Sequence, residues 1–217
     1  MKFENTAVMN FEGAFRGLRN PLESWAKSDS DFSTNNIGPV DLDLAHRMIK
    51  AGASDRKFLR QILVCVDITA PLYWYKEFDT YKIGTTANST STMHKLSSTP
   101  ITMDCFETGD FAEDLILYED SPYNPPYDMK DYWSMFINDL ECLRLKYNET
   151  KDQRYWKELV RLLPNGWLQT RTVTLNYEIL RNMYTQRRHH RLVEWHAFCD
   201  WVKTLPYAEE LILYNLD

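Results

Sequence analysis

The chain has 217 residues, 44% of them hydrophobic, which is enough for one sizeable domain with its own core. Its net charge is −6, whereas a nucleic-acid polymer requires a basic surface, so we exclude nucleic acid as the main partner. The four cysteines form no CxxC pair, which is typical of a reduced protein without disulfides or zinc. The sequence contains neither a run of roughly 18 apolar residues nor an apolar signal region, and we expect a soluble, cytoplasmic protein.

The first residues, about 1–40, are predicted to form an N-terminal extension that packs on a single domain. Within this extension, Phe11, Phe15 and Leu18 have the spacing of a short amphipathic helix. Residues 27–31 are polar and favour turns and helix caps, so we expect a surface loop there.

A helix, a strand and a second helix are predicted next. Residues 41–51 (DLDLAHRMIKA) have helical spacing, and Gly52 is a natural end for this helix. Residues 62–68 (ILVCVDI) are a continuous apolar run with β-branched members, which predicts a strand covered on both faces. An aromatic helix is expected at 72–79. The Thr/Ser/Asn-rich stretch at 85–92 is interpreted as a loop, either for binding or as a solvated linker.

The second half of the chain is dominated by helical patterns. The proline-rich stretch at 121–128 predicts a turn region. Residues 129–147 have a clear apolar stripe, which predicts a helix, and a shorter helix is expected at 151–162. Residues 170–175 (TRTVTL) predict a strand, followed by one long helix that runs from about 179 to 205.

The predicted last helix carries charged residues on its apolar face. At about 100° per residue, Arg187, Arg191 and Glu194 share one stripe with apolar side chains. The apolar members are Ile179, Leu180, Met183, Tyr184, Phe198, Trp201, Val202 and Leu205. A buried guanidinium needs a polar or anionic partner. Two interpretations stay open: Arg187 is satisfied by Glu194 or an adjacent carboxylate, or it is the centre of a ligand site.

The common sequence motifs for phosphate binding and hydrolysis are absent: GxGxxG, GxxxxGK[ST], GxSxG and HExxH do not occur. His189, His190 and His196 point in different directions on a helix, so we expect no metal site. The features that remain are the basic run 187–191, Asn176 at a strand end and the Thr/Ser/Asn-rich loop. Together they suit a phosphorylated, flat ligand such as a nucleotide or a flavin.

Two blocks of the sequence carry a resemblance to a known family. Residues 58–91 contain a strand, an Ala-Pro pair, an aromatic helix and a Ser/Asn-rich loop. Residues 160–187 contain an arginine before Leu-Pro, a strand, an asparagine and a helix that ends in arginine. In both blocks the chain resembles the flavin-dependent thymidylate synthases, at low identity, over roughly residues 42–211.

The resemblance implies roles for five residues at the cofactor and the substrate. Asn176 and Asn182 fall where the family holds flavin with asparagines, and Ile83 and Lys82 fall in the same cofactor-binding region. Arg187 matches an arginine that the family places against the pyrimidine of dUMP. It would be the catalytic residue, because it would stabilise negative charge that develops on the ring.

Three further residues are assigned to the substrate, and the sequence departs from the family near them. Arg161 lies one position closer to the proline than the family's nucleotide-binding arginine, and Thr90 and Ser91 belong to the loop that grips the dUMP phosphate. That loop lacks its arginine here. Glu178 stands where the family has a flavin-binding arginine, and the Arg-His-Arg motif is replaced by residues 80–82 (Thr-Tyr-Lys), where lysine cannot make a two-pronged contact.

The expectation that follows is one α+β domain over residues 1–217, with helices packed on a central, largely antiparallel sheet. The resemblance implies a homotetramer that uses FAD, with methylenetetrahydrofolate and NADPH as co-substrates, on dUMP or a related pyrimidine nucleotide. The alternative is a non-catalytic nucleotide-binding protein that has kept the pocket but lost the flavin chemistry, because positive charges of the family are missing.

Overall fold

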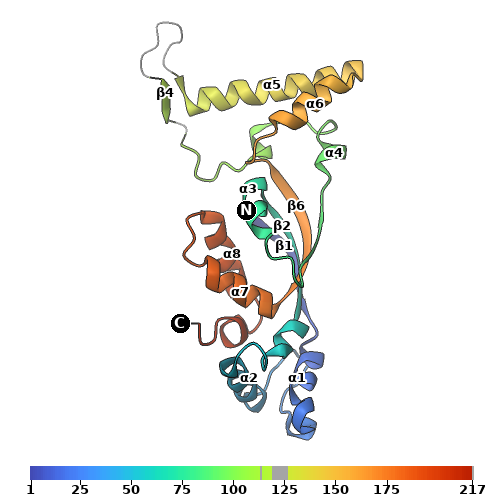
Figure 1. The fold of residues 1–217 in the computed structure, drawn as a ribbon, viewed down its shortest axis with the longest axis vertical. Coiled ribbons are helices and arrows are strands. Elements are labelled where there is room, and N and C mark those ends of the chain that lie inside the picture. The colour runs from blue at the N-terminus through green and yellow to red at the C-terminus, as the bar shows by residue number, and fades with distance from the viewer. Residues whose placement is uncertain (113, 119–126, 217) are drawn as a thin grey trace. The chain divides into compact units, whose positions relative to one another are not determined.

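The computed structural model describes residues 1–112, 114–118 and 127–216 (Figure 1). Most of the predicted proline-rich turn at 121–128 therefore lies outside the described residues. The chain forms two compact units, each described by itself below. The first comprises Met1–Ile68, Glu77–Asn88 and Arg171–Asp217, and the second comprises Thr69–Lys76 and Ser89–Thr170. Three strands have residues in both units, and the single domain stays a prediction.

A four-stranded sheet is the central element of the fold (Figure 1). In sheet order its strands are β1 (Lys2–Met9), β2 (Leu63–Pro71), β6 (Leu168–Asn176) and β3 (Thr86–Ser89). Asp67 on β2 accepts hydrogen bonds from Asn5 on β1, at 2.8 Å, and from Thr172 on β6, at 2.6 Å. Further along, Thr69 lies 2.7 Å from Thr170, so β2 and β6 run antiparallel. The two hydrogen bonds lower the pKa of Asp67 and favour its charged form.

The structure corrects the sequence at three strands: one differs from its prediction, one was predicted as a loop and one was not predicted. The strand predicted at 62–68 is not covered on both faces, because buried Val64, Val66 and Ile68 alternate with partly exposed residues, as in a half-covered antiparallel sheet. The loop predicted at 85–92 contains the edge strand β3 and the first residue of the short helix α4 (Thr92–Lys95). The N-terminal residues form the sheet strand β1, which the mixed polar sequence KFENTAVM does not predict.

The first unit contains helices at both ends of the chain. They are α1 (Phe11–Arg19), α2 (Pro39–Ala51), the 3-10 helix η3 (Lys57–Gln61), α7 (Tyr177–Arg187), α8 (Val193–Lys203) and the π-helix η5 (Ala208–Ile212). The predicted α1 and α2 are confirmed, and Gly52 ends α2 with φ of 116°, a conformation that favours glycine. Trp195, Phe198 and Leu180 are fully buried in the core of this unit.

The long helix predicted over 179–205 is wrong, because the structure has two helices with a break between Arg187 and Val193. A continuous helix would use the backbone N–H of Leu192 for the carbonyl of Arg188. Instead, Nδ1 of His190 accepts this N–H at 3.1 Å. This contact lies inside the break and engages the backbone N–H of Leu192, the N-cap residue of α8.

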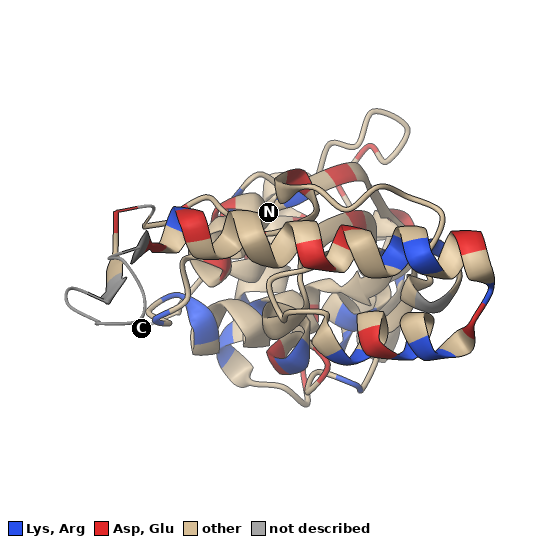
Figure 2. Cartoon of the chain, turned by 90° about the horizontal axis from the view of Figure 1, so that it is seen from above, with Lys and Arg blue, Asp and Glu red and all other residues tan. Residues whose placement is uncertain are grey.

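The second unit contains two helices that are consecutive in the chain, α5 (Met129–Thr150) and α6 (Gln153–Leu162), as the sequence predicts. Asp128 and Asp152 cap them by accepting the backbone N–H groups of Asp131 and Arg154, each at 2.9 Å. Charged residues of both signs lie along these helices (Figure 2). The buried apolar cluster of the unit comprises Leu96, Ile101, Phe106, Leu140 and Leu159. Strands β4 (Ile116–Tyr118) and β5 (Tyr127–Asp128) pair antiparallel. The helix α3 (Leu72–Phe78) follows directly on β2.

The polar stretch at 27–31 is exposed, as predicted, and it also holds a buried ion pair in place. Asp41 on α2 is fully buried and accepts a hydrogen bond from Nε of Arg19 at 2.6 Å. The hydroxyls of Ser28 and Ser30 donate to its other oxygen at 2.6 and 2.5 Å. Burial opposes the ionisation of Asp41, but these hydrogen bonds outweigh it and lower its pKa. The network ties α1 to α2 inside the first unit.

Candidate functional site

A pocket of about 640 Å³ lies in the first unit where β6 runs into α7. Its walls come from four segments: the residues around η3, the stretch before β3, the start of α7 and the C-terminal segment. The lining residues are Arg56, Arg60, Ile83, Gly84, Asn176, Glu178, Ile179, Arg181, Asn182, Thr185 and Leu216. Its volume is within the range of roughly 300–1,000 Å³ that is usual for small-molecule sites.

Asn176 joins the strand to the helix and faces the pocket. Its Oδ1 caps α7 by accepting the N–H of Ile179 at 3.1 Å, and the residue is only 8% exposed. Its Nδ2 has no acceptor among the residues that the structure describes. Asn182, one and a half turns further along α7, is exposed; its Oδ1 accepts from Gln186 at 2.9 Å, which leaves its amide nitrogen open as well. The pocket therefore offers two amide donors, one from the cap of α7 and one from the helix itself.

Ile83 and Gly84 form the wall opposite the helix start. Gly84 has φ of 72°, and a Cβ there would lie 2.8 Å from Cδ1 of Ile179 and 3.3 Å from Nδ2 of Asn176. This close approach requires glycine. Ile83 is 93% exposed, so the lining of the pocket includes an exposed apolar side chain. An exposed isoleucine beside amide donors suits a flat, partly apolar ligand.

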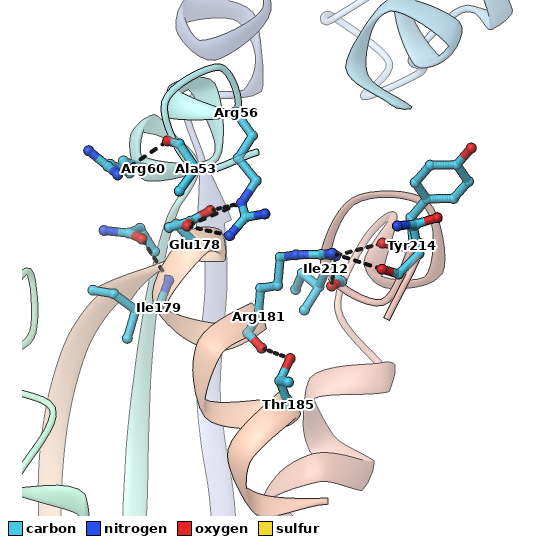
Figure 3. Close-up of polar contacts among 11 residues, drawn as sticks. Ala53, Arg56, Arg60, Glu178, Ile179, Arg181, Thr185, Ile212 and Tyr214 are labelled. Atoms are coloured by element: carbon cyan, nitrogen blue, oxygen red, sulfur yellow. Dashed lines mark hydrogen bonds and ion pairs between the residues drawn. The ribbon is translucent and has the colours of Figure 1, made fainter. Parts of the chain in front are cut away.

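The side chain of Glu178 is held by Arg56, an arginine to which the sequence assigns no role. Nε of Arg56 lies 2.9 Å from Oε2 of Glu178, and Nη2 lies 3.0 Å from Oε1, so the contact is two-pronged (Figure 3). Both side chains are largely shielded from solvent. The negative charge at position 178 is thus offset by a positive charge from a segment that is more than a hundred residues away in sequence.

Arg60 and Arg181 also line the pocket but differ in their contacts. Arg60 is exposed, and its one hydrogen bond is a long contact of 3.4 Å from Nη2 to the carbonyl of Ala53 (Figure 3). Arg181 is buried and donates to the carbonyls of Ile212, at 2.8 Å, and Tyr214, at 2.6 Å (Figure 3). Burial and the nearby charge of Arg56 lower the pKa of Arg181. Arg181 fixes the C-terminal segment, and Arg60 leaves most of its donors to the pocket.

Arg187 lies in a separate cluster of the first unit. Its Nη1 donates to Oε2 of Glu77 at 2.7 Å, and its Nε donates to the hydroxyl of Tyr81 at 2.9 Å. Nε1 of Trp195 donates to the same oxygen of Glu77 at 3.0 Å, and the guanidinium carbon lies 4.8 Å from the centre of the Trp195 ring. Nε2 of His190 is 3.2 Å from that oxygen. Of the two partners left open by the sequence, the adjacent carboxylate is correct and Glu194 is not.

The residues assigned to the site from sequence fall into several places. The structure brings Ile83, Asn176 and Asn182 together in the pocket, while Lys82 is exposed next to it and Arg187 stands in its own cluster. Their proposed roles stay predictions.

The remaining three assigned residues belong to the second unit. The backbone N–H of Thr90 donates to Thr170 at 2.9 Å, and Ser91 caps α4. Arg161 pairs with Glu158 on the exposed side of α6. The binding roles of these residues stay predictions too.

Sequence reasoning missed Arg56, Arg60 and Arg181. A signal did exist for the first two, because two arginines four residues apart before an apolar strand lie on one face of a helical turn. The Arg56–Glu178 pair itself joins distant segments and leaves no local pattern. Among the described residues no cluster of His, Cys, Asp or Glu suits a metal ion, and no described helix is long and apolar enough to cross a membrane.

Fold and pocket together define the class: an α+β protein with helices packed on an antiparallel sheet and a pocket where its last strand enters a helix. No protein-family model matches the sequence, and no curated protein matches it significantly. Solved structures do match. The flavin-dependent thymidylate synthase ThyX from Helicobacter pylori, complexed with FAD and dUMP, is 18% identical with a TM-score of 0.67, over 99% of this chain and 98% of that one.

A second structure of Helicobacter pylori ThyX with FAD and dUMP is 17% identical with a TM-score of 0.65, over 98% of this chain and 97% of that chain. The protein therefore has the fold of the flavin-dependent thymidylate synthases, as the resemblance implied. The N-terminal extension over residues 1–40 stays a prediction.

Proposed function

We propose that the protein is an FAD-dependent enzyme similar to thymidylate synthase, which modifies C5 of dUMP or a related pyrimidine nucleotide. Methylenetetrahydrofolate would supply the carbon and NADPH the reducing equivalents, and the protein would act as a homotetramer in the cytoplasm. The observation that carries the proposal is the convergence of Ile83, Asn176 and Asn182, three residues assigned to the cofactor, on one pocket.

The lining of this pocket fits a flavin. The amide nitrogens of Asn176 and Asn182 are donors without described acceptors, and the ring carbonyls of a flavin are acceptors. Ile83 and Ile179 provide apolar surface for a flat ring. When bound, FAD would supply the hydride and methylene transfer chemistry. The residues of the chain would bind and orient it, with the Asn176 amide fixed by its second role as the cap of α7.

A second candidate function is nucleotide binding without turnover, and one observation favours it. Arg187 is the residue assigned to stabilise charge on the pyrimidine, yet its own charge is offset by Glu77 at 2.7 Å. A neutralised arginine stabilises a developing negative charge less well than a free one. This candidate keeps the pocket and removes the chemistry.

The proposal is tested first by flavin binding. Protein incubated with FAD and freed of unbound ligand should keep an absorbance band at about 450 nm, a property of the flavin. The variant Ile83→Glu should weaken FAD binding at least about tenfold, because it places a carboxylate at the pocket rim. Leu22→Glu is the matched control, since Leu22 is also an exposed apolar residue of the first unit, at 83%, and lines no described pocket.

Protein that retains no flavin, or an Ile83→Glu variant that binds FAD as the wild type does, contradicts the proposal. The two candidates are then separated by NADPH oxidation that depends on dUMP and methylenetetrahydrofolate. Turnover supports the enzyme, whereas dUMP-induced thermal stabilisation without turnover supports the binding protein.

A further inference from the structure

The pocket contains an excess of positive charge although the chain as a whole is acidic. Its described lining has three arginines and one glutamate, whereas the net charge of the protein is −6. Arg181 directs its donors at backbone carbonyls of the C-terminal segment, so its hydrogen bonds are used there. Arg56 and Arg60 are the two arginines of the lining that are not directed at the C-terminal segment, and both retain donors for a ligand.

Arg56 is positioned by Glu178. The carboxylate takes Nε and Nη2 of the guanidinium and leaves Nη1 without a hydrogen bond to any described residue. A planar guanidinium held on one edge by a carboxylate has a fixed orientation, so its remaining edge is oriented in advance for an anion. Glu178 also cancels the charge of Arg56, which means that this pair contributes a directed donor and little net charge.

Arg60 supplies the net charge that the pair lacks. It is exposed, lines the same pocket and makes only the 3.4 Å contact with Ala53, so Nε and Nη1 have no described acceptor. It lies on η3, four residues after Arg56, which is the N-cap of that 3-10 helix, and both side chains line the same pocket. One directed guanidinium and one unpaired guanidinium together provide the fork-shaped donors that phosphate oxygens accept.

We propose that Arg60 and Arg56 form a phosphate-binding subsite of this pocket, with Glu178 as the positioning residue of Arg56. The subsite rests on the proposed function in that it gives the flavin its phosphate contact. It predicts a ligand with a phosphate or diphosphate group, so FAD should bind in preference to riboflavin. The negative charge of Glu178 then does not remove the anion site, because Arg60 on η3 supplies the positive charge instead.

The test compares the affinities of FAD and riboflavin, measured by quenching of flavin fluorescence, in the wild type and three variants. Arg60→Gln should lower FAD affinity about tenfold, the usual effect of one charge-assisted hydrogen bond, and leave riboflavin affinity unchanged. Arg47→Gln is the control, since Arg47 is an exposed arginine on α2 that pairs with Asp43 outside the pocket. The double variant Arg56→Gln/Glu178→Gln removes the pair without leaving a lone charge and should also reduce the preference for FAD.

Inorganic pyrophosphate provides a measurement that needs no flavin. It should raise the Tm of the wild type and of Arg47→Gln, and it should have no such effect on Arg60→Gln. If Arg60-dependent stabilisation by pyrophosphate occurs in protein that binds no flavin, the subsite stands and the flavin function falls. If flavin binds but the ratio of FAD to riboflavin affinity is the same in Arg60→Gln, the subsite is refuted while the flavin function stands. Where neither flavin nor pyrophosphate binds, both are refuted.

Discussion

Glu77 contacts three side chains, and its carboxylate offsets the charge of Arg187. Arg187 and Trp195 donate to the same oxygen, and His190 accepts at Nδ1, so that its proton is carried at Nε2 toward Glu77. The side chain of Glu77 is one-third exposed, at 33%, and solvent screens the pair in part.

We expect substitutions of Glu77 and of Arg187 to have opposite effects on dUMP binding. Glu77→Gln should raise the affinity for dUMP, because it frees the charge of Arg187, and should lower the free energy of unfolding by about 1–2 kcal/mol after screening. Arg187→Ala should abolish dUMP-induced stabilisation. Arg191→Ala is the control, since Arg191 is an exposed arginine of the same segment. Calorimetry with dUMP decides: unchanged affinity in Arg187→Ala removes Arg187 from the site.

Elements whose apolar periodicity is local were predictable from sequence, and those that depend on partners were not. The helices at 129–150 and 153–162 and the strand at 168–176 follow their patterns closely. The strand at Lys2–Met9 has no such pattern, because its stability comes from pairing with β2. The break after Arg187 was hidden because the apolar stripe keeps its phase across it, and the contact between the His190 ring and the Leu192 amide inside the break leaves no apolar pattern.

The candidate site shows the same division. Residues at the start of α7 were found because strand, cap and helix are continuous in sequence. The arginines of η3 were not assigned, since their position in the pocket depends on folding of a segment some hundred residues away. From the sequence, Glu178 therefore indicates that a positive charge of the family is missing. Only the contact in the folded protein shows that Arg56 is its partner.

The segment before β3 depends on one backbone conformation. Gly84→Ala should destabilise the protein by about 1–2 kcal/mol, because φ of 72° strains an L-residue and the new Cβ would meet Ile179. It should also weaken flavin binding by displacing Ile83. Gly166→Ala is the matched control, since no atom lies within 4 Å of its added Cβ. Urea unfolding measures the stability of both variants, and equal stabilities would show that the tight approach at Gly84 is unimportant.

At the scale of the whole molecule, the Arg19–Asp41 network is expected to govern acid stability. The pKa of Asp41 is lowered in the folded state, so its contribution is complete above the unfolded value of about 3.9 and disappears as the pH falls through the lower folded value. Arg19→Met should destabilise the protein by about 3–5 kcal/mol near neutral pH, since it leaves a buried carboxylate without its cation.

Urea unfolding between about pH 3 and pH 7 measures this effect. The stability of the wild type should fall with pH more steeply than that of Asp41→Asn, in which the group no longer titrates. Asp43→Asn is the control, because Asp43 is on the same helix but its side chain is 69% exposed. Parallel pH profiles for the wild type and Asp41→Asn would rule out Asp41 as the determinant.

Arg181 lines the pocket and binds the C-terminal segment, so the pocket depends on that segment being intact. Its guanidinium needs the carbonyls of Ile212, Tyr214 and Asn215, and Leu216 is itself part of the pocket wall. Trimming of a few residues by a contaminating carboxypeptidase would strand a buried cation and open the pocket at once. A preparation clipped in this way would be both less stable and poor in ligand, and its inactivity would be mistaken for an inherent lack of function. An intact-mass measurement belongs before every binding experiment on this protein.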